Sequence, residues 1–193
     1  MAKTVYLVRH GQTYFNFYHK VQGRCDSPLT ELGIRQVEKS RDYFVDHKIK
    51  FDHAYSSTQE RASDTLEIIT DHEMKYSRLK DLREKCYGIF EGQDEFLLPW
   101  NYGNDQINPT MELNEDVVAR MKRAMIRVLN ETNDGETSLV VGHGDILARY
   151  VRKMANQDDF SGFDNAAIVK LTFDGEEPTF DEYIWPAKGL SNR

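Results

Sequence analysis

The chain has 193 residues, a length typical of one domain and sufficient for a buried core. Hydrophobic residues make up 39% and charged residues 30% of the chain, which excludes a disordered protein or a fibrous repeat. Asp and Glu outnumber Lys and Arg by 32 to 25, giving a net charge of −7, which argues against general binding to nucleic acid or an anionic membrane. Any anion that binds must therefore meet a local group of positive charges.

Cysteine usage and the N-terminal segment indicate the compartment. Cys25 and Cys86 lie far apart in the chain and form no C-x-x-C motif, so neither a disulfide framework nor a cysteine zinc site is expected. The N-terminal segment turns polar before an apolar signal region forms, and no apolar run approaches the roughly 20 residues that span a bilayer. We expect a cytoplasmic protein that is not bound to membranes.

The first half of the chain predicts two strand and helix pairs. Residues 5–8 form a β-branched and aromatic run that predicts a buried strand ending at Arg9 and His10. A helix with Thr30 as its N-cap follows and ends near His47, since its apolar residues recur at helical spacing. A second strand is expected at residues 52–56, followed by a helix over residues 58–71 that carries Arg61 in its first turn.

The second half repeats this pattern and ends in a hairpin. Asn114 is expected to cap a helix, and the apolar run at residues 138–141 predicts a strand that stops at Gly142-His143-Gly144. Another helix then runs to Ala155. Residues 167–173 and 179–185 alternate apolar and polar side chains around Asp174-Gly175, which is typical of a β-hairpin.

These elements predict a single α/β domain over residues 1–193. We expect a three-layer sandwich in which helices flank a mainly parallel central sheet, with a late antiparallel hairpin. Residues 92–113 interrupt the pattern with Gly, Pro and several large apolar side chains. A loop of this length inside a compact domain is often a lid or a substrate-facing insertion, although simple packing on the core is equally consistent with the sequence. The oligomeric state is not readable from the sequence.

Two histidines follow predicted strands at equivalent places. Because open parallel sheets bind ligands beyond the carboxyl ends of their strands, we expect His10 and His143 to face one another if their strands are neighbours. Arg9 and Arg61 add two permanent positive charges to the same edge, and guanidinium groups bind phosphate or carboxylate through paired hydrogen bonds. Two histidines and two arginines in an acidic protein favour phosphate chemistry. A histidine and carboxylate metal site is a minor alternative, because the arginines oppose a divalent cation.

At this point the residues resemble a known family. The run Arg9-His10-Gly11-Gln12-Thr13 with Asn16 resembles the signature of the histidine phosphatase superfamily, in its phosphoglycerate-mutase-like branch. Further matches follow in order along the chain: Gln22-Gly23, residues 26–33, Ser56-Ser57, Arg61-Ala62, Leu82-Arg83-Glu84, Gly88, Glu91-Gly92 and His143-Gly144. The matches extend over most of the chain, so the resemblance rests on an ordered series of motifs and not on one short motif.

The resemblance implies a covalent mechanism without a metal or other cofactor. His10 would attack a phosphate monoester to form a phosphohistidine that water then hydrolyses. Arg9, Arg61 and a protonated His143 would bind the phosphoryl oxygens, and Glu84 would protonate the leaving oxygen. Asn16, Gln22, Gly23 and the Gly144 backbone N–H are further candidates for contacts with the substrate. Asp145 stands where relatives often have a small or apolar residue, and an extra carboxylate there would repel a polyanionic substrate.

Three functions remain open at this stage. A phosphatase acting on a small phosphorylated metabolite is favoured, because cofactor-dependent mutases of this family are generally longer and residues 93–115 contain no Lys or Arg to hold a second charged group. An apolar part of the substrate is expected to meet Tyr14, Phe15, Trp100 or Tyr102. A phosphoglycerate-mutase-type phosphoryl transfer is the alternative. A non-catalytic phosphate-binding module is the third reading, which Glu84 disfavours because binding alone needs no proton donor.

Overall fold

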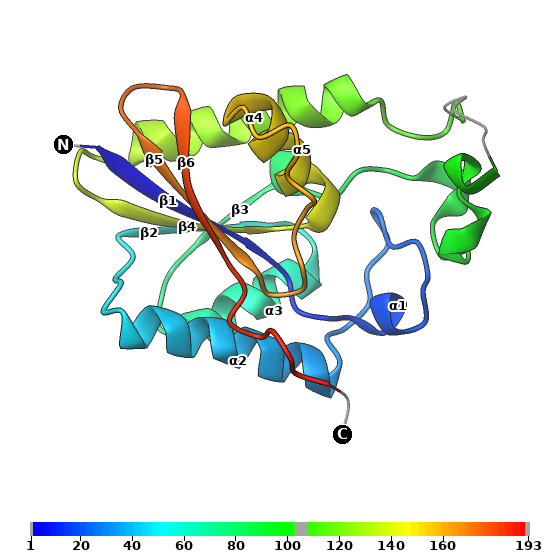
Figure 1. Cartoon of the computed structure of the whole chain (residues 1–193), viewed down its shortest axis with the longest axis horizontal. Coiled ribbons are helices and arrows are strands. Elements are labelled where there is room, and N and C mark those ends of the chain that lie inside the picture. Colours follow the sequence, from blue (N-terminus) through cyan, green and yellow to red (C-terminus); the bar gives the residue numbers. More distant parts are fainter. Residues whose placement is uncertain (1, 103–107, 192–193) are drawn as a thin grey trace.

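A six-stranded sheet forms the centre of the protein. The computed structural model describes residues 2–102 and 108–191, and its strand order is β3-β2-β4-β1-β5-β6 (Figure 1). The strands are β1 (Lys3–Arg9), β2 (His53–Ser57), β3 (Ser77–Leu79), β4 (Thr137–Gly142), β5 (Ile168–Phe173) and β6 (Pro178–Ile184). Strands β3, β2, β4 and β1 pair in parallel, while β5 is antiparallel to both β1 and β6. The predicted α/β class with a late antiparallel hairpin is confirmed.

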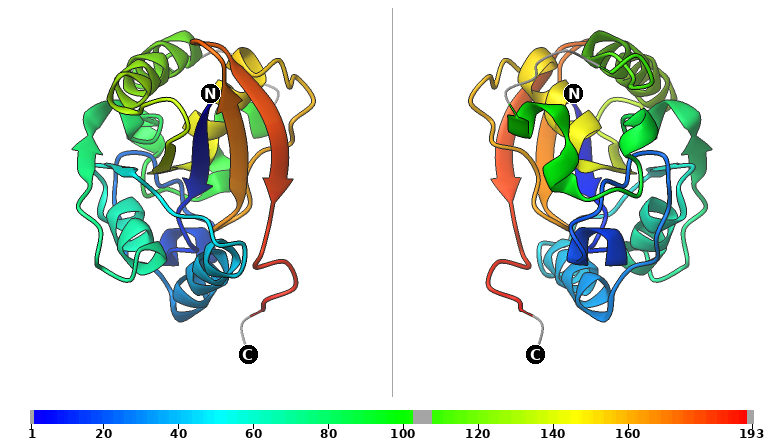
Figure 2. Two further views of the ribbon diagram at one scale, coloured as in Figure 1. Left: turned by 90° about the vertical axis from the view of Figure 1, so that its left-hand side faces the viewer. Right: turned by 90° about the vertical axis from the view of Figure 1, so that its right-hand side faces the viewer.

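Helices cover both faces of the sheet. The α-helices are α1 (Tyr14–Phe17), α2 (Glu31–Asp46), α3 (Glu60–Ile69), α4 (Asn114–Glu131) and α5 (Gly144–Met154), and short 3₁₀ segments occupy Lys80–Leu82, Gly88–Phe90, Glu95–Leu97 and Pro99–Tyr102. Helices α4 and α5 lie on one face, and α2 and α3 lie on the other (Figures 1 and 2). No helix of residues 2–102 and 108–191 is long and apolar enough to cross a membrane.

The side chains of β1 point alternately to the two faces of the sheet and pack in both hydrophobic cores. Val5 and Leu7 pack in the core under α4 and α5, whereas Tyr6 and Val8 pack in the core over α2 and α3. Successive side chains of a strand point to opposite faces, so a strand buried on both sides reads as a continuous apolar run. The sequence run at residues 5–8 therefore corresponds to a central strand.

The boundaries of α2 agree with the prediction, and those of α4 do not. The Thr30 hydroxyl accepts a hydrogen bond from the Gly33 N–H at 2.9 Å, and His47 is the C-cap of α2. In α4 the N-cap is Leu113 and makes no side-chain cap. Asn114, predicted as the cap, is instead the first helical residue, because its side-chain oxygen accepts a hydrogen bond from Lys85 Nζ at 2.7 Å.

Register in the sheet brings the two strand-terminal histidines together. Strands β1 and β4 are parallel neighbours, with Arg9 paired to Gly142, and the His10 N–H donates to the Gly142 carbonyl at 3.1 Å. His10 and His143 therefore leave the sheet side by side at the same edge. This is the position at which parallel sheets bind ligands.

Candidate active site

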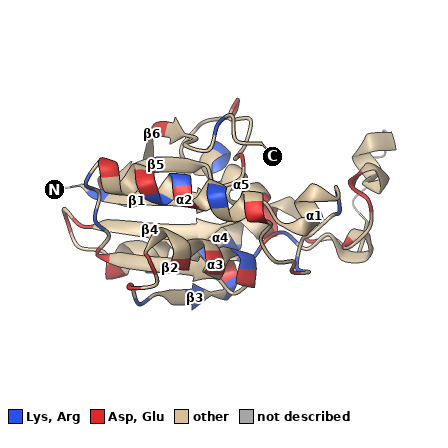
Figure 3. Ribbon diagram, turned by 90° about the horizontal axis from the view of Figure 1, so that it is seen from below, with Lys and Arg blue, Asp and Glu red and all other residues tan. Residues whose placement is uncertain are grey.

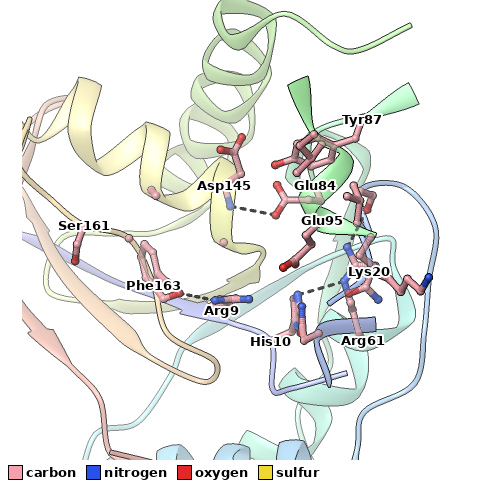
Figure 4. A pocket seen from close by; sticks show the side chains of 18 of the residues that line it. Arg9, His10, Lys20, Arg61, Glu84, Tyr87, Glu95, Asp145, Ser161 and Phe163 are labelled. Atoms are coloured by element: carbon pink, nitrogen blue, oxygen red, sulfur yellow. Dashed lines mark hydrogen bonds between the residues drawn. The ribbon is translucent and has the colours of Figure 1, made fainter. Parts of the chain in front are cut away.

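A pocket of about 350 Å³ opens at the carboxyl ends of β1 and β4 (Figure 4). Of the predicted site residues, all except His143 line it: Arg9, His10, Asn16, Gln22, Gly23, Arg61, Glu84 and Gly144. These residues come from separate parts of the chain, so the fold gathers what the sequence separates. The side chains of Arg9, His10, Glu84 and Asp145 surround one cavity in Figure 4.

Hydrogen bonds define the tautomer of His10. Its Nδ1 lies 2.7 Å from the carbonyl oxygen of Gly11, which can only accept, so Nδ1 carries the proton. Its Nε2 accepts a hydrogen bond of 3.3 Å from Arg61 Nε, as an unprotonated nitrogen does. Burial, followed by the charges of Arg61 and Arg9, holds the pKa of His10 well below its ordinary value. His10 is therefore neutral, with its lone pair on Nε2.

His143 lies behind His10 and is completely buried. The two ring centroids are 5.3 Å apart at an angle of 62°. Neither ring nitrogen of His143 has a hydrogen-bond partner in the described structure. Burial and the charge of Arg61 hold its pKa well below the ordinary value, so the protein groups alone favour the neutral ring. The protonated His143 expected from the sequence needs an adjacent anion, whose negative charge raises the pKa of the ring.

Arg61 is the largest side chain that is fully buried, and protein oxygens hold every part of its guanidinium except Nε. Nη1 donates to the Cys25 carbonyl at 2.9 Å and pairs with Asp26 at 2.8 Å, and Nη2 donates to the Gly23 carbonyl at 2.9 Å. A buried cation is stable only when it is paired and hydrogen-bonded in this way. The loop at residues 23–26 therefore fixes the orientation of Arg61 toward His10.

Arg9 lies on the other side of His10 from Arg61 and forms no ion pair within residues 2–102 and 108–191 (Figure 4). Its Nη1 donates to the carbonyl of Phe163 at 2.6 Å, and its buried Nε has no partner in the described structure. Burial lowers the pKa of Arg9 from its ordinary value, although the group remains a cation at neutral pH. A Cβ at Gly144 would come within 3.3 Å of Arg9 Nε, so glycine at this position leaves room for the guanidinium.

Glu84 faces the N-terminus of α5. Its carboxylate accepts hydrogen bonds from the backbone N–H groups of Lys85 at 2.8 Å and of Asp145 and Ile146 at 3.1 Å each. These bonds lower its pKa, but burial and then the Asp145 carboxylate raise it, and the net shift is upward. A carboxylic acid whose pKa is raised in a cleft is suited to donate a proton near neutral pH.

Several site residues were not found by reasoning from the sequence. Gln59 is buried and bridges the site: its amide nitrogen donates to the Gly23 carbonyl at 2.7 Å, and its oxygen accepts from the Glu84 N–H at 2.8 Å. Lys20, Tyr87 and Arg152 also line the pocket. None of these residues stands directly after a predicted strand, so position in the sequence gave no signal for them.

One expectation about the surroundings of the site is wrong. None of Tyr14, Phe15, Trp100 and Tyr102 lines the pocket, whose large apolar side chains are Tyr87, Leu98 and Phe163. Tyr14, Trp100 and Tyr102 are exposed, because the turn and the 3₁₀ segments that carry them lie outside the sheet edge.

The donor set of the site is cationic. Within residues 2–102 and 108–191, no three His, Cys, Asp or Glu side chains gather in an arrangement that would hold a metal ion. Figure 3 shows Lys, Arg, Asp and Glu distributed over the helices and loops around the sheet. The local positive charge required by an anion in this acidic protein is therefore found in the pocket.

Comparison with known proteins agrees with this geometry. Residues 5–186 match the family description "Histidine phosphatase superfamily (branch 1)". The chain is 29% identical over 183 residues to the "Uncharacterized phosphatase PhoE" of Bacillus subtilis (strain 168), covering 93% of each chain. It is 31% identical over 166 residues to a 2,3-bisphosphoglycerate-dependent phosphoglycerate mutase of Rhizobium etli (strain CIAT 652), covering 78% of this chain and 79% of the relative.

A solved structure supports the same assignment. The phosphoglycerate mutase from Bacillus anthracis str. Sterne superimposes with a TM-score of 0.84 at 26% identity, covering 93% of this chain and 92% of the other. The relatives include both phosphatases and mutases, so they establish the family and leave the reaction to be argued from the site. The chain is therefore an enzyme of the histidine phosphatase superfamily, branch 1.

Proposed function

We propose that this enzyme is a phosphatase that hydrolyses a small phosphate monoester through a phosphohistidine at Nε2 of His10, with Glu84 as the proton donor. The observation that carries the proposal is the fixed tautomer of His10, whose Nδ1 donates to Gly11 and whose Nε2 keeps a lone pair beside two arginines. A neutral imidazole in this state is a nucleophile for phosphorus.

In the first step, the Nε2 lone pair forms a bond to phosphorus, and the bond between phosphorus and the ester oxygen breaks. Glu84 gives its proton to that oxygen, which leaves as an alcohol. In the second step, water attacks phosphorus, the bond to Nε2 breaks, and Glu84 takes the proton from water. Inorganic phosphate is released, and His10 and Glu84 return to their starting states.

Positive charge at the bottom of the pocket supports both steps. Arg9 and Arg61 are placed to bind the phosphoryl oxygens, and His143 becomes the third cation when the phosphate raises its pKa. Asn16, Gln22, Gly23 and Gly144 line the same pocket, and we propose that they supply further hydrogen bonds to the substrate. The Glu84 side chain lies against α5 on the opposite wall, where the leaving group would be (Figure 4).

We also propose that the insertion predicted at residues 92–113 faces the substrate. Its described part is joined to residues 19–21 by backbone hydrogen bonds, with the Val21 N–H donating to Gln93 at 2.8 Å and the Glu95 N–H to His19 at 2.8 Å. Glu95 and Leu98 line the pocket. Gly103 and Asp105, which also belong to this insertion, lie outside the described residues.

Replacing His10 tests the proposal directly. His10→Ala removes the nucleophile, so turnover of p-nitrophenyl phosphate should fall by at least about a thousandfold. His47→Ala is the matched control, because His47 is exposed on the C-terminal end of α2, and it should retain full activity. Substantial turnover by the folded His10→Ala protein would disprove the phosphohistidine mechanism. Labelled phosphate trapped on wild-type protein would exclude a module that only binds phosphate.

The mutase alternative makes a different prediction about products. A phosphatase should release inorganic phosphate from 3-phosphoglycerate at a rate that does not depend on an added bisphosphate. A mutase would form 2-phosphoglycerate and would need that bisphosphate as a primer. Product analysis by phosphorus NMR, with and without 2,3-bisphosphoglycerate, separates the two reactions. The proposed chemistry needs only side chains of the protein, so activity should also persist in excess chelator, and its loss would contradict a metal-independent mechanism.

A further inference from the structure

The outer wall of the pocket carries a guanidinium that the proposed chemistry does not use. Arg152 lies on α5, partly buried, and lines the same pocket as His10. Gly144, Ala148 and Arg152 all line it, and their spacing places them on one face of the helix. This face runs from the phosphate end of the pocket outward. The guanidinium of Arg152 contacts the loop at residues 160–161, and Ser161, Gly162 and Phe163 of this loop line the pocket as well.

Backbone carbonyls orient Arg152 without cancelling its charge. Its Nε donates to the Phe160 carbonyl at 2.7 Å, and its Nη2 donates to the Ser161 carbonyl at 3.2 Å. Phe163, in the same loop, accepts from Arg9 at 2.6 Å. A carbonyl fixes the direction of a guanidinium but carries no net charge. The loop at residues 160–163 therefore holds two guanidiniums in one pocket, and each keeps its charge for a ligand.

Two other nearby cations, Lys20 and Arg149, are neutralised by acidic partners. Lys20 pairs with Asp94 at 2.6 Å, and Arg149 pairs with Asp145 at 2.5 Å. Within residues 2–102 and 108–191, Arg152 forms no ion pair. Cations that line a pocket and lack a protein partner are suited to an anionic part of a ligand.

We propose that Arg152 binds a carboxylate of the substrate, so that the enzyme prefers phosphate monoesters that carry a carboxylate over neutral counterparts. The proposal rests on the proposed phosphatase function and names a substrate class for the same site. The planar guanidinium donates two parallel hydrogen bonds to a carboxylate. Two acidic residues, Glu95 and Asp145, also line the pocket and oppose the greater charge of a second phosphate. A single carboxylate is therefore the favoured second group.

Binding to a variant that cannot turn over tests this subsite. In the His10→Ala background, calorimetry gives dissociation constants for two matched pairs: 3-phosphoglycerate with glycerol 3-phosphate, and phosphoserine with phosphoethanolamine. The members of each pair differ in whether they carry the carboxylate. We expect the carboxylate member to bind at least about fivefold more tightly, and Arg152→Gln to bring the ratio close to one. Arg152→Lys, which keeps the charge but loses the planar pair of donors, should give an intermediate ratio.

Lys153→Gln is the matched control, because Lys153 is the next residue on α5 and does not line this pocket. It should leave the ratio unchanged. An equal fall in the ratio for Lys153→Gln would overturn the proposal in favour of a general charge effect. If Arg152 only stabilises the loop at residues 160–163, Arg152→Gln will weaken the binding of both members of each pair by the same factor. That result also overturns the proposal.

Two further outcomes would count against a carboxylate subsite. The first is a ratio of dissociation constants near one for each matched pair in the His10→Ala background. The second is tighter binding of 2,3-bisphosphoglycerate than of 3-phosphoglycerate. Failure of the phosphatase proposal is seen separately, as absence of p-nitrophenyl phosphate turnover by the wild-type protein. That result does not affect the ratio of dissociation constants, so the two proposals are tested independently.

Discussion

Opposing influences set the protonation of Glu84. Three backbone N–H groups stabilise its charged form, while enclosure in the protein and the nearby Asp145 carboxylate destabilise it. The loss of solvation is the larger effect, so the pKa of Glu84 is raised. As the proposed acid, Glu84 must be protonated when the leaving group departs. The rate with an alkyl phosphate should therefore fall as the pH rises through this raised pKa.

Asp145→Asn should move this alkaline limb of the pH profile to lower pH. The substitution removes a negative charge that disfavours ionisation of Glu84, so the carboxyl group loses its proton earlier as the pH rises. We expect a shift of a few tenths to about one pH unit in kcat for an alkyl phosphate. The measurement is a kcat profile for each variant under saturating substrate, and the shift is read as the difference between profiles.

Asp64→Asn is the control for this shift, because Asp64 lies on α3, is partly buried and does not line the pocket. Its profile should superimpose on that of the wild-type protein. An unmoved limb in Asp145→Asn would show that Asp145 does not influence the acid, whereas movement to higher pH would contradict the sign of the interaction.

At the residue scale, the groups that perform the proposed chemistry were predictable and those that hold them were not. His10 and His143 directly follow apolar strand runs, which predicted that they meet if their strands are neighbours, and the family resemblance added Glu84. Gln59 and Asp26 had no such signal, because each acts through a partner distant in the sequence: Gln59 through Glu84, and Asp26 through Arg61. Such contacts depend on packing in three dimensions, which spacing along the chain does not encode.

At the scale of elements, α2 supports the loop that carries His10 through two glycines. A Cβ on Gly33, in the first turn of α2, would lie 2.0 Å from the backbone oxygen of Gln12, and a Cβ on Gly11 would lie 2.5 Å from the Gly33 carbonyl. Real Cβ atoms do not approach backbone oxygens so closely, so both positions require glycine. The helix therefore packs directly against the backbone next to the proposed nucleophile.

Gly33→Ala should lower both stability and activity. The added methyl group must push the loop at residues 11–13 away from α2, which costs about 1–3 kcal/mol in free energy of unfolding. The displacement also moves His10, so kcat for p-nitrophenyl phosphate should fall about tenfold or more. Urea denaturation and steady-state kinetics measure the two effects. Ile34→Ala, at the next and exposed position of α2, should change stability by less than about 0.5 kcal/mol. Wild-type kcat in folded Gly33→Ala would contradict this role for the contact.

Elements of several turns or with long apolar runs were predicted from the sequence, and the short ones were not. Helix α2 has a clear cap and an apolar stripe, and its ends at Thr30 and His47 agree with the prediction. Strand β3 has three residues with an exposed Arg78 at its centre, so it lacks an apolar run. Helix α1 is a single turn closed by a Thr13 and Asn16 capping box. Elements of three or four residues are too short to show a periodic pattern of apolar residues, so contacts with the rest of the fold determine them.

At the scale of the whole molecule, charge is distributed unevenly between the exterior and the site. The net charge is −7, yet the buried Arg61, the partly buried Arg9 and two buried histidines meet at one sheet edge. Burial lowers the pKa of both Arg9 and Arg61, which shows that the folded protein destabilises their charged forms. An anion bound between these guanidiniums would offset this unfavourable contribution to folding. Arg152, the guanidinium of the proposed carboxylate subsite, belongs to α5 and lies outside residues 93–115.

Inorganic phosphate should therefore stabilise the entire fold. An anion that binds the native pocket and not the unfolded chain adds about 2.7 kcal/mol of stability at one hundred times its dissociation constant, and for a chain of this size the melting temperature should rise by roughly 5–10 °C. Thermal unfolding with phosphate or with chloride at equal ionic strength measures the specific part. Arg9→Met removes one cation of the pocket. Without phosphate, this variant should lose little stability. The increase in melting temperature caused by phosphate should be smaller than in the wild-type protein. The proposal is contradicted if phosphate and chloride raise the melting temperature equally, or if phosphate raises it as much in Arg9→Met as in the wild-type protein. Either result would show that phosphate does not stabilise the fold through the cations of the pocket.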